Sequence, residues 1–505
     1  KIKSFSDDEI GTIAKSFNEA VTIISNQTKS KDLFMRNMMH ELKTPITKAM
    51  FIAETLEEEK TRQSLQKAFK RMDDIIKDIK IKNLNSAADL VLEDRVHKSL
   101  YSDNNIFEEE LDKVFNNTWV WLAHESELPE AGSYKTAKIG RQPVIAVRDR
   151  KKNIHVMLNR CRHRGATVCE GKSGKTKAFT CPYHGWGYGL DGSLRALPKP
   201  EEYENILDKA EFGLIKVRTE SYQGMIFATL KEDLEPLNEF LGGAKKWIDL
   251  FMKQGGGYPI KALGDHRFRF PGNWKIQLEN TTDAYHFPIV HKSFISSVDE
   301  EAAEVFDFLD GEGFVEDLGN GHSVMVMIPE LVDLEANLEE PIPERFADLA
   351  KQLSEEGHPD EEVRRLVRAV GGSGFNLNLF PNIACSMAFF RNLVPISVNE
   401  TEIHHVALGG EGAPEAFNQK RMRLHEHFQG PMGFGTPDDG EAWERVQAGS
   451  IAGTDGWIMV NRGMSKLSTS EDGNVKGAVC SETGMRAAYQ KYKQLMSKQS
   501  EQKGA

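Results

Sequence analysis

The stretch Cys161–Trp186 reads C-R-H-R-G-A-T-V-C-E-G-K-S-G-K-T-K-A-F-T-C-P-Y-H-G-W. It contains two pairs of metal-binding side chains, Cys161 with His163 and Cys181 with His184. Each pair combines one thiolate and one imidazole within a short turn. Two thiolates and two imidazoles suit either an iron–sulfur cluster or a tetrahedral zinc ion. The stretch therefore predicts a metal centre that is held by two loops.

The order of the ligands separates these two alternatives. A structural zinc site usually places Cys near Cys and His near His, whereas here the pairs are mixed, Cys-x-His and Cys-x-x-His. In a Rieske [2Fe–2S] centre, two His replace two Cys on one of the irons. The flanking H-R-G and C-P-Y-H-G-W motifs also resemble Rieske proteins. We therefore expect Cys161 and Cys181 to bind one iron and His163 and His184 to bind the other, with zinc as the alternative.

Length and composition indicate a globular protein of several domains. The chain has 505 residues, of which 39% are hydrophobic and 28% are charged. Its net charge of −12 argues against nucleic acid as a partner, because phosphate binding requires a basic surface. No apolar run reaches the ~20 residues of a membrane span, and no secretory signal is present. Five Cys without a disulfide-framework spacing favour a cytoplasmic protein with reduced thiols.

Residues 1–85 differ in character from the rest of the chain. The segment D-D-E-I-G-T-I-A-K-S-F-N-E-A resembles the end of a HAMP linker, and F-M-R-N-M-M-H-E-L-K-T-P-I resembles the phosphoacceptor box of sensor histidine kinases, with His40 as the acceptor. A heptad-like spacing follows and predicts a helical hairpin that dimerises; its seam consists of Leu65, Phe69, Met72, Ile76 and Ile79. After residue 85 we find no ATP-binding motif. We therefore interpret residues 1–85 as a kinase fragment whose His40 is idle, joined to an unrelated enzyme.

We expect an α+β protein with four parts. These are the HAMP-end plus kinase-type helical hairpin (1–85), a linker with a lead-in helix (86–129), a small antiparallel β domain that carries the Rieske motif (130–230), and a larger α+β catalytic domain with an antiparallel sheet (231–505). Alternating residues predict strands at Ser133–Ile139, Val144–Arg148 and Ile154–Asn159. Apolar periodicity predicts helices at Phe107–Phe115, Leu234–Met252 and, on the surface, Met485–Lys498.

A second metal motif lies in residues 273–291, N-W-K-I-Q-L-E-N-T-T-D-A-Y-H-F-P-I-V-H. On a helix, Asp283 and His286 would share one face, and Pro288 would bend or end that helix so that His291 converges with His286. We expect the third ligand to be Asp439, with the adjacent Asp438 as the alternative. Two His and one carboxylate on one face of Fe(II) leave positions open for O2.

With both motifs present, residues 93–500 resemble the large (alpha) subunit of the Rieske non-haem iron aromatic ring-hydroxylating oxygenases. The resemblance implies a [2Fe–2S] cluster that passes electrons to a mononuclear Fe(II) in the neighbouring subunit of a trimer. It implies His286, His291 and Asp439 as iron ligands, and Asp283 as the catalytic carboxylate that bridges a cluster His and an iron His. It also places Asn280 near the iron as a distant supporting group, with a helix cap or a backbone hydrogen bond as the alternative role.

The expected activity is hydroxylation of an aromatic ring with O2. No strand–GxGxxG–helix context for a flavin or nicotinamide is found, so electrons from NAD(P)H must arrive through a separate reductase, with or without a ferredoxin. A small beta subunit is possible within the resemblance, with a homotrimer or an α3β3 assembly. Basic residues around the cluster loops could dock the electron donor; they are Arg160, Arg162, Arg164, Lys172, Lys175 and Lys177.

The substrate cavity should be apolar, with few polar groups. Phe287, Leu379, Phe380 and Phe389 are the aromatic and aliphatic candidates for its walls, and Arg391 could pair with an aromatic carboxylate. The ligands alone do not distinguish mono- from dioxygenation. Two alternative functions remain open from the sequence. One is a redox-linked signalling protein of the histidine kinase type, and the other is a Rieske electron carrier whose C-terminal half is structural.

Overall fold

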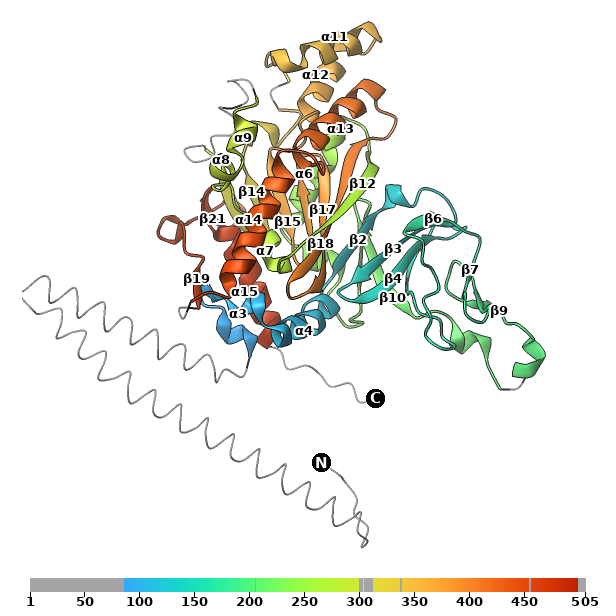
Figure 1. Cartoon of the computed structure of the whole chain (residues 1–505). Helices are drawn as coiled ribbons and strands as arrows, with labels where there is room; N and C mark the ends of the chain where they lie inside the picture. The colour runs from blue at the N-terminus through green and yellow to red at the C-terminus, as the bar shows by residue number, and fades with distance from the viewer. Residues whose placement is uncertain are drawn as a thin grey trace, which may run out of the picture. The chain divides into compact units, whose positions relative to one another are not determined.

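The computed structural model describes residues 86–497, except for 205, 299–302, 304–311, 337 and 454–455. The predicted hairpin with His40 lies outside the described residues. The chain divides into two compact units, Lys1–Leu90 with Gly453–Gly456 and Val91–Ala452 with Trp457–Ala505. In the first unit the structure describes one short helix, η1 (Ala87–Leu90). The second unit contains both predicted metal sites, and its described residues are drawn in colour in Figure 1.

The N-terminal part of this unit contains a seven-stranded antiparallel sheet with the order β2-β11-β10-β5-β4-β3-β6. Its strands are β2 (Val120–His124), β3 (Ser133–Ile139), β4 (Gln142–Arg148), β5 (Ile154–Leu158), β6 (Ser173–Lys175), β10 (Lys216–Tyr222) and β11 (Met225–Thr229). A small three-stranded sheet lies beside it and consists of β7 (Phe179–Thr180), β8 (Gly187–Tyr188) and β9 (Leu194–Ala196). The two predicted cluster loops are the β5–β6 and β7–β8 connections.

The three strands expected around the first cluster loop match β3, β4 and β5 to within two residues. Their alternation buries one side of the sheet, where Ile145, Val147 and Met157 form a core together with Cys161 and Cys181. The sheet also includes β2, which lies in the range that we expected to be a lead-in. Since β2 pairs with β11, the β structure begins before residue 130.

The C-terminal part is built on a nine-stranded antiparallel sheet with the order β12-β18-β17-β16-β15-β14-β13-β21-β20. Its strands are β12 (Ile260–Phe270), β13 (Phe314–Gly319), β14 (His322–Val326), β15 (Phe375–Leu379), β16 (Ile383–Ser386), β17 (Phe389–Ser397), β18 (Glu400–Gly410), β20 (Ser468–Thr469) and β21 (Val475–Ala478). A separate two-stranded ladder joins β1 (Arg95–His97) to β19 (Trp457–Met459). The expected α+β class, with a small β domain and a larger α+β domain, is confirmed.

The two faces of the large sheet have different chemistry, because successive side chains of a strand point to opposite faces. One face carries a row of paired apolar residues that join the main core, namely Val324, Leu377, Cys385, Phe390 and Val406. The other face carries a row that includes Asn378, Ala384, Arg391, His405 and His266. The apolar face packs on the core of the first sheet, and the polar face is available for a site.

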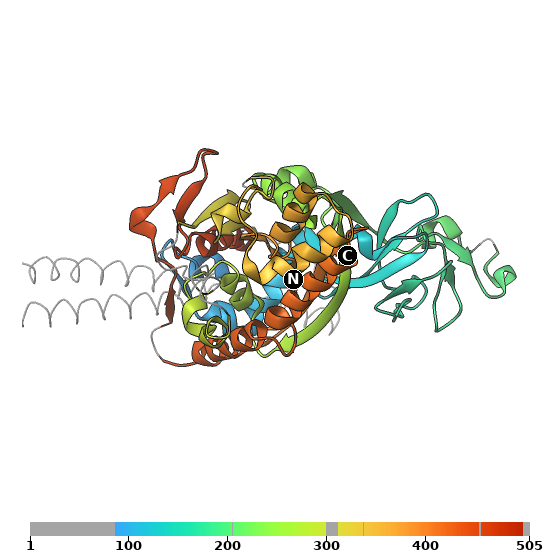
Figure 2. The same ribbon diagram turned by 90° about the horizontal axis from the view of Figure 1, so that it is seen from above.

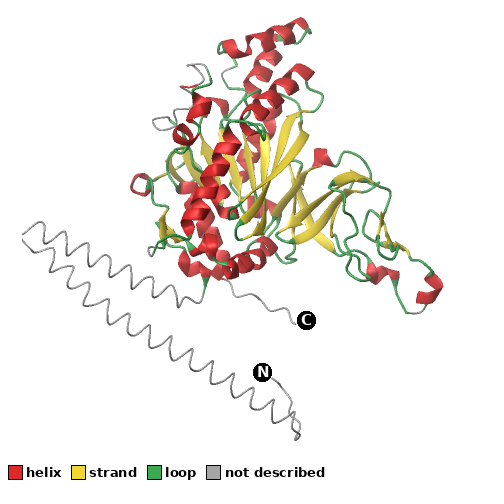
Figure 3. Ribbon diagram, viewed as in Figure 1, coloured by secondary structure: helices red, strands yellow, loops and turns green. Residues whose placement is uncertain are grey.

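Helices surround the large sheet, whereas the first sheet has few (Figures 2 and 3). They are α3 (Ser99–Ser102), α4 (Asn104–Lys113), α5 (Leu237–Leu241), α6 (Ala244–Met252), α7 (Trp274–Asn280), α8 (Phe287–Val290), α9 (Lys292–Ile295), α11 (Ala347–Glu355), α12 (Asp360–Ala369), α13 (Glu415–Gln429), α14 (Gly435–Ser450) and α15 (Thr483–Ser497). Among the described residues, no helix is both long and apolar enough to cross a bilayer.

Two helix predictions were wrong. The single helix expected at Leu234–Met252 is split into α5 and α6, because Gly242 between them has a φ of +47°, which a helix does not allow. The C-terminal helix α15 was expected on the surface, but Tyr489, Tyr492 and Met496 on it are buried. It packs against β13 and β14, so its apolar stripe belongs to the core.

Candidate metal centres

The two cluster loops share one backbone design. In the first loop Gly165 N donates a hydrogen bond to Cys161 O, and in the second Gly185 N donates to Cys181 O, both at 3.0 Å. Each glycine has a positive φ, +77° at Gly165 and +71° at Gly185. Residues other than glycine rarely adopt this backbone conformation. The turn brings the Cys and the His of each loop to the same side, and the glycines of H-R-G and H-G-W are what allow it.

The two loops bring their imidazoles together. His163 Nδ1 lies 3.1 Å from His184 Nδ1, so the two nitrogens are aimed at the same small region. Trp186 stacks on the His163 ring at a centroid distance of 4.9 Å, and Tyr183 contacts the His184 ring at 3.8 Å. The aromatic neighbours hold both imidazoles, which are half-buried, at the edge of the domain.

The two thiols lie deeper than the imidazoles. Cys161 and Cys181 are each 2% exposed, and the Tyr188 hydroxyl lies 3.2 Å from Cys161 Sγ. Burial, with a further contribution from Cys161, raises the pKa of Tyr188 far above its usual value, so the group remains a protonated hydroxyl beside the sulfur. The sequence reasoning did not single out Tyr188, although its place two residues after C-P-Y-H-G-W was a usable signal.

The second predicted site also comes together, although by a different local structure. Helix α7 ends at Asn280, and α8 begins only at Phe287. The expectation that Asp283 and His286 share a helix face was therefore wrong, since both lie in the turn between the two helices. Pro288 occupies the first turn of α8, where it starts a helix instead of bending one. His291 lies at the junction of α8 and α9.

Asp439, in α14, lies between the two imidazoles. Its Oδ1 is 3.2 Å from His291 Nε2 and 3.4 Å from His286 Nε2. The ligand atoms of the three residues all lie within 4.8 Å of one another. We call this group, His286, His291 and Asp439, the iron triad. Two imidazoles and a carboxylate on one side of a point leave the other side open.

The neighbouring Asp438 differs from Asp439 in its surroundings. Its side chain is 36% exposed, compared with 5% for Asp439, and its Oδ2 faces His291 Nδ1 at 3.7 Å. Adjacent residues of a helix point about 100° apart, so only one of the two carboxylates can face the imidazole Nε2 atoms. This geometry favours Asp439, and the ligand assignment stays a prediction.

Asp283 lies beside His286 Nδ1, on the side of the ring opposite to Asp439. Its Oδ2 is 3.5 Å from His286 Nδ1, and its Oδ1 accepts the backbone N–H groups of Tyr285 at 2.9 Å and of His286 at 3.2 Å. Burial lowers the pKa of His286, but Asp283 and Asp439 together outweigh it and raise this pKa to about 10. The pKa of Asp439, which burial alone would raise, is held far below its usual range by the two imidazoles. The group is therefore built to hold a cation.

Asn280 lies closer to the triad than the sequence analysis assumed. Its Nδ2 is 3.2 Å from Asp439 Oδ1, to which it donates, and 3.3 Å from His286 Nε2. It is the last residue of α7, so the end of that helix orients an amide toward the metal site.

A cavity of about 540 Å³ opens beside the triad. It is lined by Asn280, Asp283, His286, His291 and Asp439, by apolar side chains that include Phe287, Phe294, Met325, Met327, Ile328, Leu331, Val367, Leu424 and Phe428, and by the polar groups Asn376, Ser386, Arg391 and Gln429. A volume of this size suits a small organic ligand. It lies on the polar face of the large sheet.

Of the hydrophobic residues predicted to line the cavity, Phe287 does so and three do not. Leu379 joins the core on the opposite face, Phe380 approaches Trp274 at a ring distance of 6.3 Å, and Phe389 packs on His405 and His425. Those three predictions were wrong for different reasons. Leu379 lies on the opposite face of the sheet, and Phe380 follows the end of β15. Phe389 shares the face of Arg391 but packs on the histidines and not on the cavity. Arg391 does line the cavity, and it is 4% exposed.

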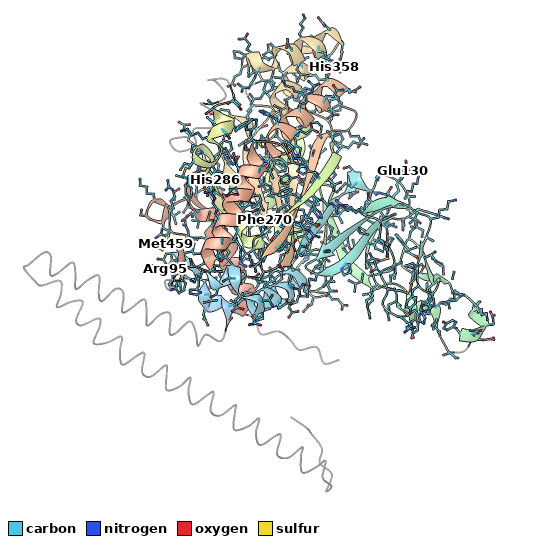
Figure 4. All side chains as sticks on the ribbon, in the orientation of Figure 1. Arg95, Glu130, Phe270, His286, His358 and Met459 are labelled. Atoms are coloured by element: carbon cyan, nitrogen blue, oxygen red, sulfur yellow. The ribbon has the colours of Figure 1, made fainter. Side chains whose placement is uncertain are left out.

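Within one chain the two centres lie far apart. In Figures 1 and 2, β7 and β9 beside the cluster loops lie at one end of the coloured region, and α8 and α9 lie on the opposite side of the large sheet. Figure 4 labels His286 in the part with the large sheet and Glu130, which precedes β3, in the part with the first sheet. A chain does not bring its own two centres together.

The residues present fit both metal groups. Two buried thiols and two converging imidazoles match the Cys2His2 set of a Rieske cluster. The iron triad matches the two-His, one-carboxylate arrangement that binds Fe(II) with positions open for O2, and Asp283 supplies the carboxylate that commonly backs such a His. A chain with both sites belongs to the class of iron-dependent oxygenases that use an electron-storing cluster.

Comparison with known proteins identifies the family. Residues 118–218 match the Rieske [2Fe-2S] domain, residues 260–498 match the ring hydroxylating alpha subunit (catalytic domain), and residues 30–83 match the His Kinase A (phospho-acceptor) domain. The large subunit of anthranilate 1,2-dioxygenase from Acinetobacter baylyi is 31% identical, over 73% of this chain and 80% of the relative. The alpha subunit of toluate 1,2-dioxygenase from Pseudomonas putida is 32% identical, over 71% and 80%.

Solved structures agree with these relatives. Naphthalene 1,2-dioxygenase with indole bound in its active site matches with a TM-score of 0.68 and 28% identity, over 81% of this chain and 93% of that chain. The chain therefore belongs to the ring-hydroxylating dioxygenase alpha subunits. Its cofactors are a Rieske [2Fe–2S] cluster and a mononuclear iron. Proteins of this family work with a reductase or ferredoxin and often with a beta subunit. The kinase-type resemblance of the N-terminal part is also confirmed.

Proposed function

We propose that this chain is the oxygenase component of a system that adds O2 to an aromatic ring. Addition of both oxygen atoms to adjacent ring carbons consumes two electrons and two protons and gives a dihydrodiol. The main observation in favour is that the iron triad forms part of the wall of a cavity large enough for an aromatic ring. When bound, the cluster supplies electrons one at a time and the iron supplies O2 activation.

Within this proposal, the roles of the residues follow from their positions. His286, His291 and Asp439 hold the metal on one face and leave the cavity side open. Asn280 donates a hydrogen bond to Asp439 Oδ1, the oxygen that faces the two imidazoles, and so orients this carboxylate. The apolar walls hold the ring and exclude water, which would otherwise compete for the open positions. In the other centre, Cys161, His163, Cys181 and His184 hold the cluster.

We propose that electrons pass between neighbouring chains through Asp283. The separation of the two centres in one chain supports this route. His163 and His184 lie at an accessible edge, and the adjacent Tyr183 is 57% exposed. Asp283 lies 3.5 Å behind His286, so a cluster imidazole of a second chain could hydrogen-bond to its other side. A homotrimer, or an α3β3 assembly with a beta subunit, would repeat this contact in a closed ring.

We propose that the electrons originate from NAD(P)H and arrive through a reductase, with or without a ferredoxin, in the cytoplasm. Basic residues beside the cluster loops support such docking. Arg160 and Arg164 are exposed, whereas Lys175 is paired with Glu130. Because the protein has a net charge of −12, a local basic surface would guide an acidic carrier to this edge.

The test uses the iron-loaded protein with a surrogate reductase, NADH, a panel of arenes and 18O2. We expect one arene product whose mass increases by two labelled oxygen atoms. A single labelled atom would indicate monooxygenation. His286→Ala should abolish the product while the visible spectrum of the Rieske cluster persists. If the wild-type protein with intact iron and cluster incorporates no label into any arene, the proposed function is wrong.

A further inference from the structure

The side chain of Arg391 is buried beside the iron triad without an acidic partner. Its Nε donates to His405 Nε2 and its Nη2 donates to Gln429 Oε1, both at 2.9 Å. Both acceptors are neutral. Among the described residues, no group accepts a hydrogen bond from Nη1, and no carboxylate forms an ion pair with Arg391. The guanidinium lines the cavity, so its unused edge can face a ligand.

A buried charge that lacks an opposite charge is costly unless something compensates it. Burial lowers the pKa of the Arg391 guanidinium to about 10, and the negative charge of Asp439 partly offsets this effect. However, the Asp439 carboxylate already interacts with the two imidazoles of the triad. A divalent iron held by Asp439 would add positive charge to this corner of the cavity. The wall formed by Arg391 therefore favours an anion in the cavity.

Behind Arg391 lies a cluster of three histidines, His266 on β12, His405 on β18 and His425 on α13. Their ring nitrogens lie within 4.8 Å of one another, which at first sight resembles a second metal site. However, His405 Nε2 accepts from Arg391, so the neutral ring carries its proton on Nδ1 and has no lone pair left for a metal. The cluster therefore does not form a three-histidine metal site while Arg391 keeps this hydrogen bond.

The surroundings of the histidine cluster instead keep His405 neutral, so that its Nε2 can accept the hydrogen bond from Arg391. Burial lowers the pKa of His405 far below its usual value, and Arg391 lowers it further. Burial likewise lowers the pKa of His425 to about 4. Thr436 at the start of α14 donates to Gln429 Oε1 at 3.0 Å, so the second acceptor is also held. The guanidinium is thus oriented from two sides by groups that carry no charge.

We propose, resting on the proposed function, that Arg391 is the anion-binding residue of the substrate cavity and that the substrate is an aromatic carboxylate of the benzoate type. A guanidinium pairs with a carboxylate through charge-assisted hydrogen bonds. Because Arg391 is close enough to Asp439 for their charges to interact, the carboxylate belongs on the ring itself, next to the carbons that react. His405 and Gln429 are positioning residues for Arg391.

The other Arg and Lys residues that line the cavity have different surroundings; they are Arg345, Arg364, Arg368 and Lys420. Arg345 lies over the Phe346 ring at 5.3 Å. Arg364 is paired with Asp360 at 2.8 Å, and Arg368 with Glu340 at 3.6 Å. Lys420 lies over the Phe346 ring at 5.7 Å, on the α11–α13 side. Arg421 is as buried as Arg391, but backbone carbonyls of Gln254 and Ala369 hold it and it does not line the cavity. A buried guanidinium therefore does not by itself indicate an anion site. What distinguishes Arg391 is that its guanidinium has an unused edge toward the cavity.

The first experiment needs no variant. Calorimetry on the iron-loaded wild-type protein compares benzoate with benzamide, which has the same shape without the charge. We expect benzoate to bind roughly 10- to 100-fold more tightly, as expected for one charge-assisted interaction. Equal affinity for the two ligands would overturn the proposal, whatever the variants do.

The second experiment removes the charge. Arg391→Gln should weaken benzoate binding roughly 10- to 100-fold and change benzamide binding by less than about threefold. Arg391→Lys should bind benzoate with an affinity between those of the wild type and Arg391→Gln. The ammonium keeps the charge but lacks the planar guanidinium edge that can form two parallel hydrogen bonds with a carboxylate. Arg423→Gln, on the exposed side of α13, is the matched control for net charge and should leave both affinities unchanged. An equal loss in Arg391→Gln and Arg423→Gln would overturn the proposal.

The third experiment tests positioning. His405→Phe removes the acceptor and should weaken benzoate binding without weakening benzamide binding, whereas His405→Gln should restore it. Equal losses for both ligands would show that His405 acts on packing only. The proposal and the proposed function can fail separately. Benzoate binding without labelled product from any arene would leave the anion site standing, while labelled product from neutral arenes alone would refute the anion site.

Discussion

The two metal centres differ in how their ligands are distributed along the chain. All four proposed cluster ligands lie in Cys161–His184, in two loops with the same glycine-dependent turn. Two of the proposed iron ligands come from the α7–α9 segment, and the third comes from α14, which follows β12–β18 in the chain. The cluster is thus a nearly local structure, whereas the triad depends on the packing of distant elements. The two centres should therefore respond independently to mutation.

The largest effect is expected at the triad. Asp439→Ala removes the buried carboxylate between His286 and His291, so mononuclear iron and product formation should both be lost, the latter by more than about 100-fold. The Rieske spectrum should be unchanged, because the centres are separate. Metal analysis and single-turnover product assays measure this. Asp438→Ala is the control, and a larger loss there than at Asp439 would reverse the ligand assignment.

The next effect tests the link between the centres. Asp283→Asn keeps the size of the side chain but removes the charge that faces His286 Nδ1 at 3.5 Å. Both metals should remain bound, while reoxidation of the reduced cluster during turnover slows roughly 10- to 100-fold. Stopped-flow absorbance of the cluster measures this rate. An unchanged rate would mean that electrons bypass Asp283.

A third prediction concerns the pH dependence of folding stability in the catalytic domain. Burial raises the pKa of Glu279, which accepts hydrogen bonds from Tyr101 and Tyr489, from 4.5 to about 7. For an acid with a raised folded-state pKa, the folded state holds the proton longer than the unfolded state. Stability is then highest below about pH 4.5 and falls as the pH rises toward 7.

Glu279→Gln should remove that dependence. The variant should be more stable than the wild type above pH 7 by about 3 kcal/mol and gain little at pH 4.5. Urea unfolding, followed by fluorescence at both pH values, measures the difference. A variant that is less stable at pH 8 would show that the ionised carboxylate, held by its tyrosines, contributes more than its burial costs.

The smallest effect is expected at the cluster. Tyr188→Phe removes the hydroxyl that lies 3.2 Å from Cys161 Sγ, and hydrogen bonds to cluster sulfurs raise the reduction potential. The loss of one such bond, about 1 kcal/mol, should lower the potential by about 40 mV. Redox titration measures it, with Tyr183→Phe as the control. An unchanged potential would remove Tyr188 from the cluster environment.

Prediction from sequence succeeded where the signal is local. The β3, β4 and β5 strands follow from the alternation of residues within a few positions. Prediction failed where the structure depends on which partner an element packs against. The helix α15 carries an amphipathic pattern that fits a surface helix equally well, yet it is buried against β13 and β14. Likewise, Leu379 and Phe389 are as apolar as Phe287, but only Phe287 lines the cavity.

The sequence by itself determined the kind of chemistry, because the ligand types and their spacing in H-R-G and C-P-Y-H-G-W leave few metal groups that fit. It also indicated His286, His291 and Asp439 as a set. Only the tertiary structure decided that α14 turns Asp439, and not Asp438, toward the Nε2 atoms of both imidazoles. It alone decided, too, that Arg391 lies beside them without an acidic partner. Such choices depend on the faces of helices and strands, which are set by packing between segments that are far apart in the chain.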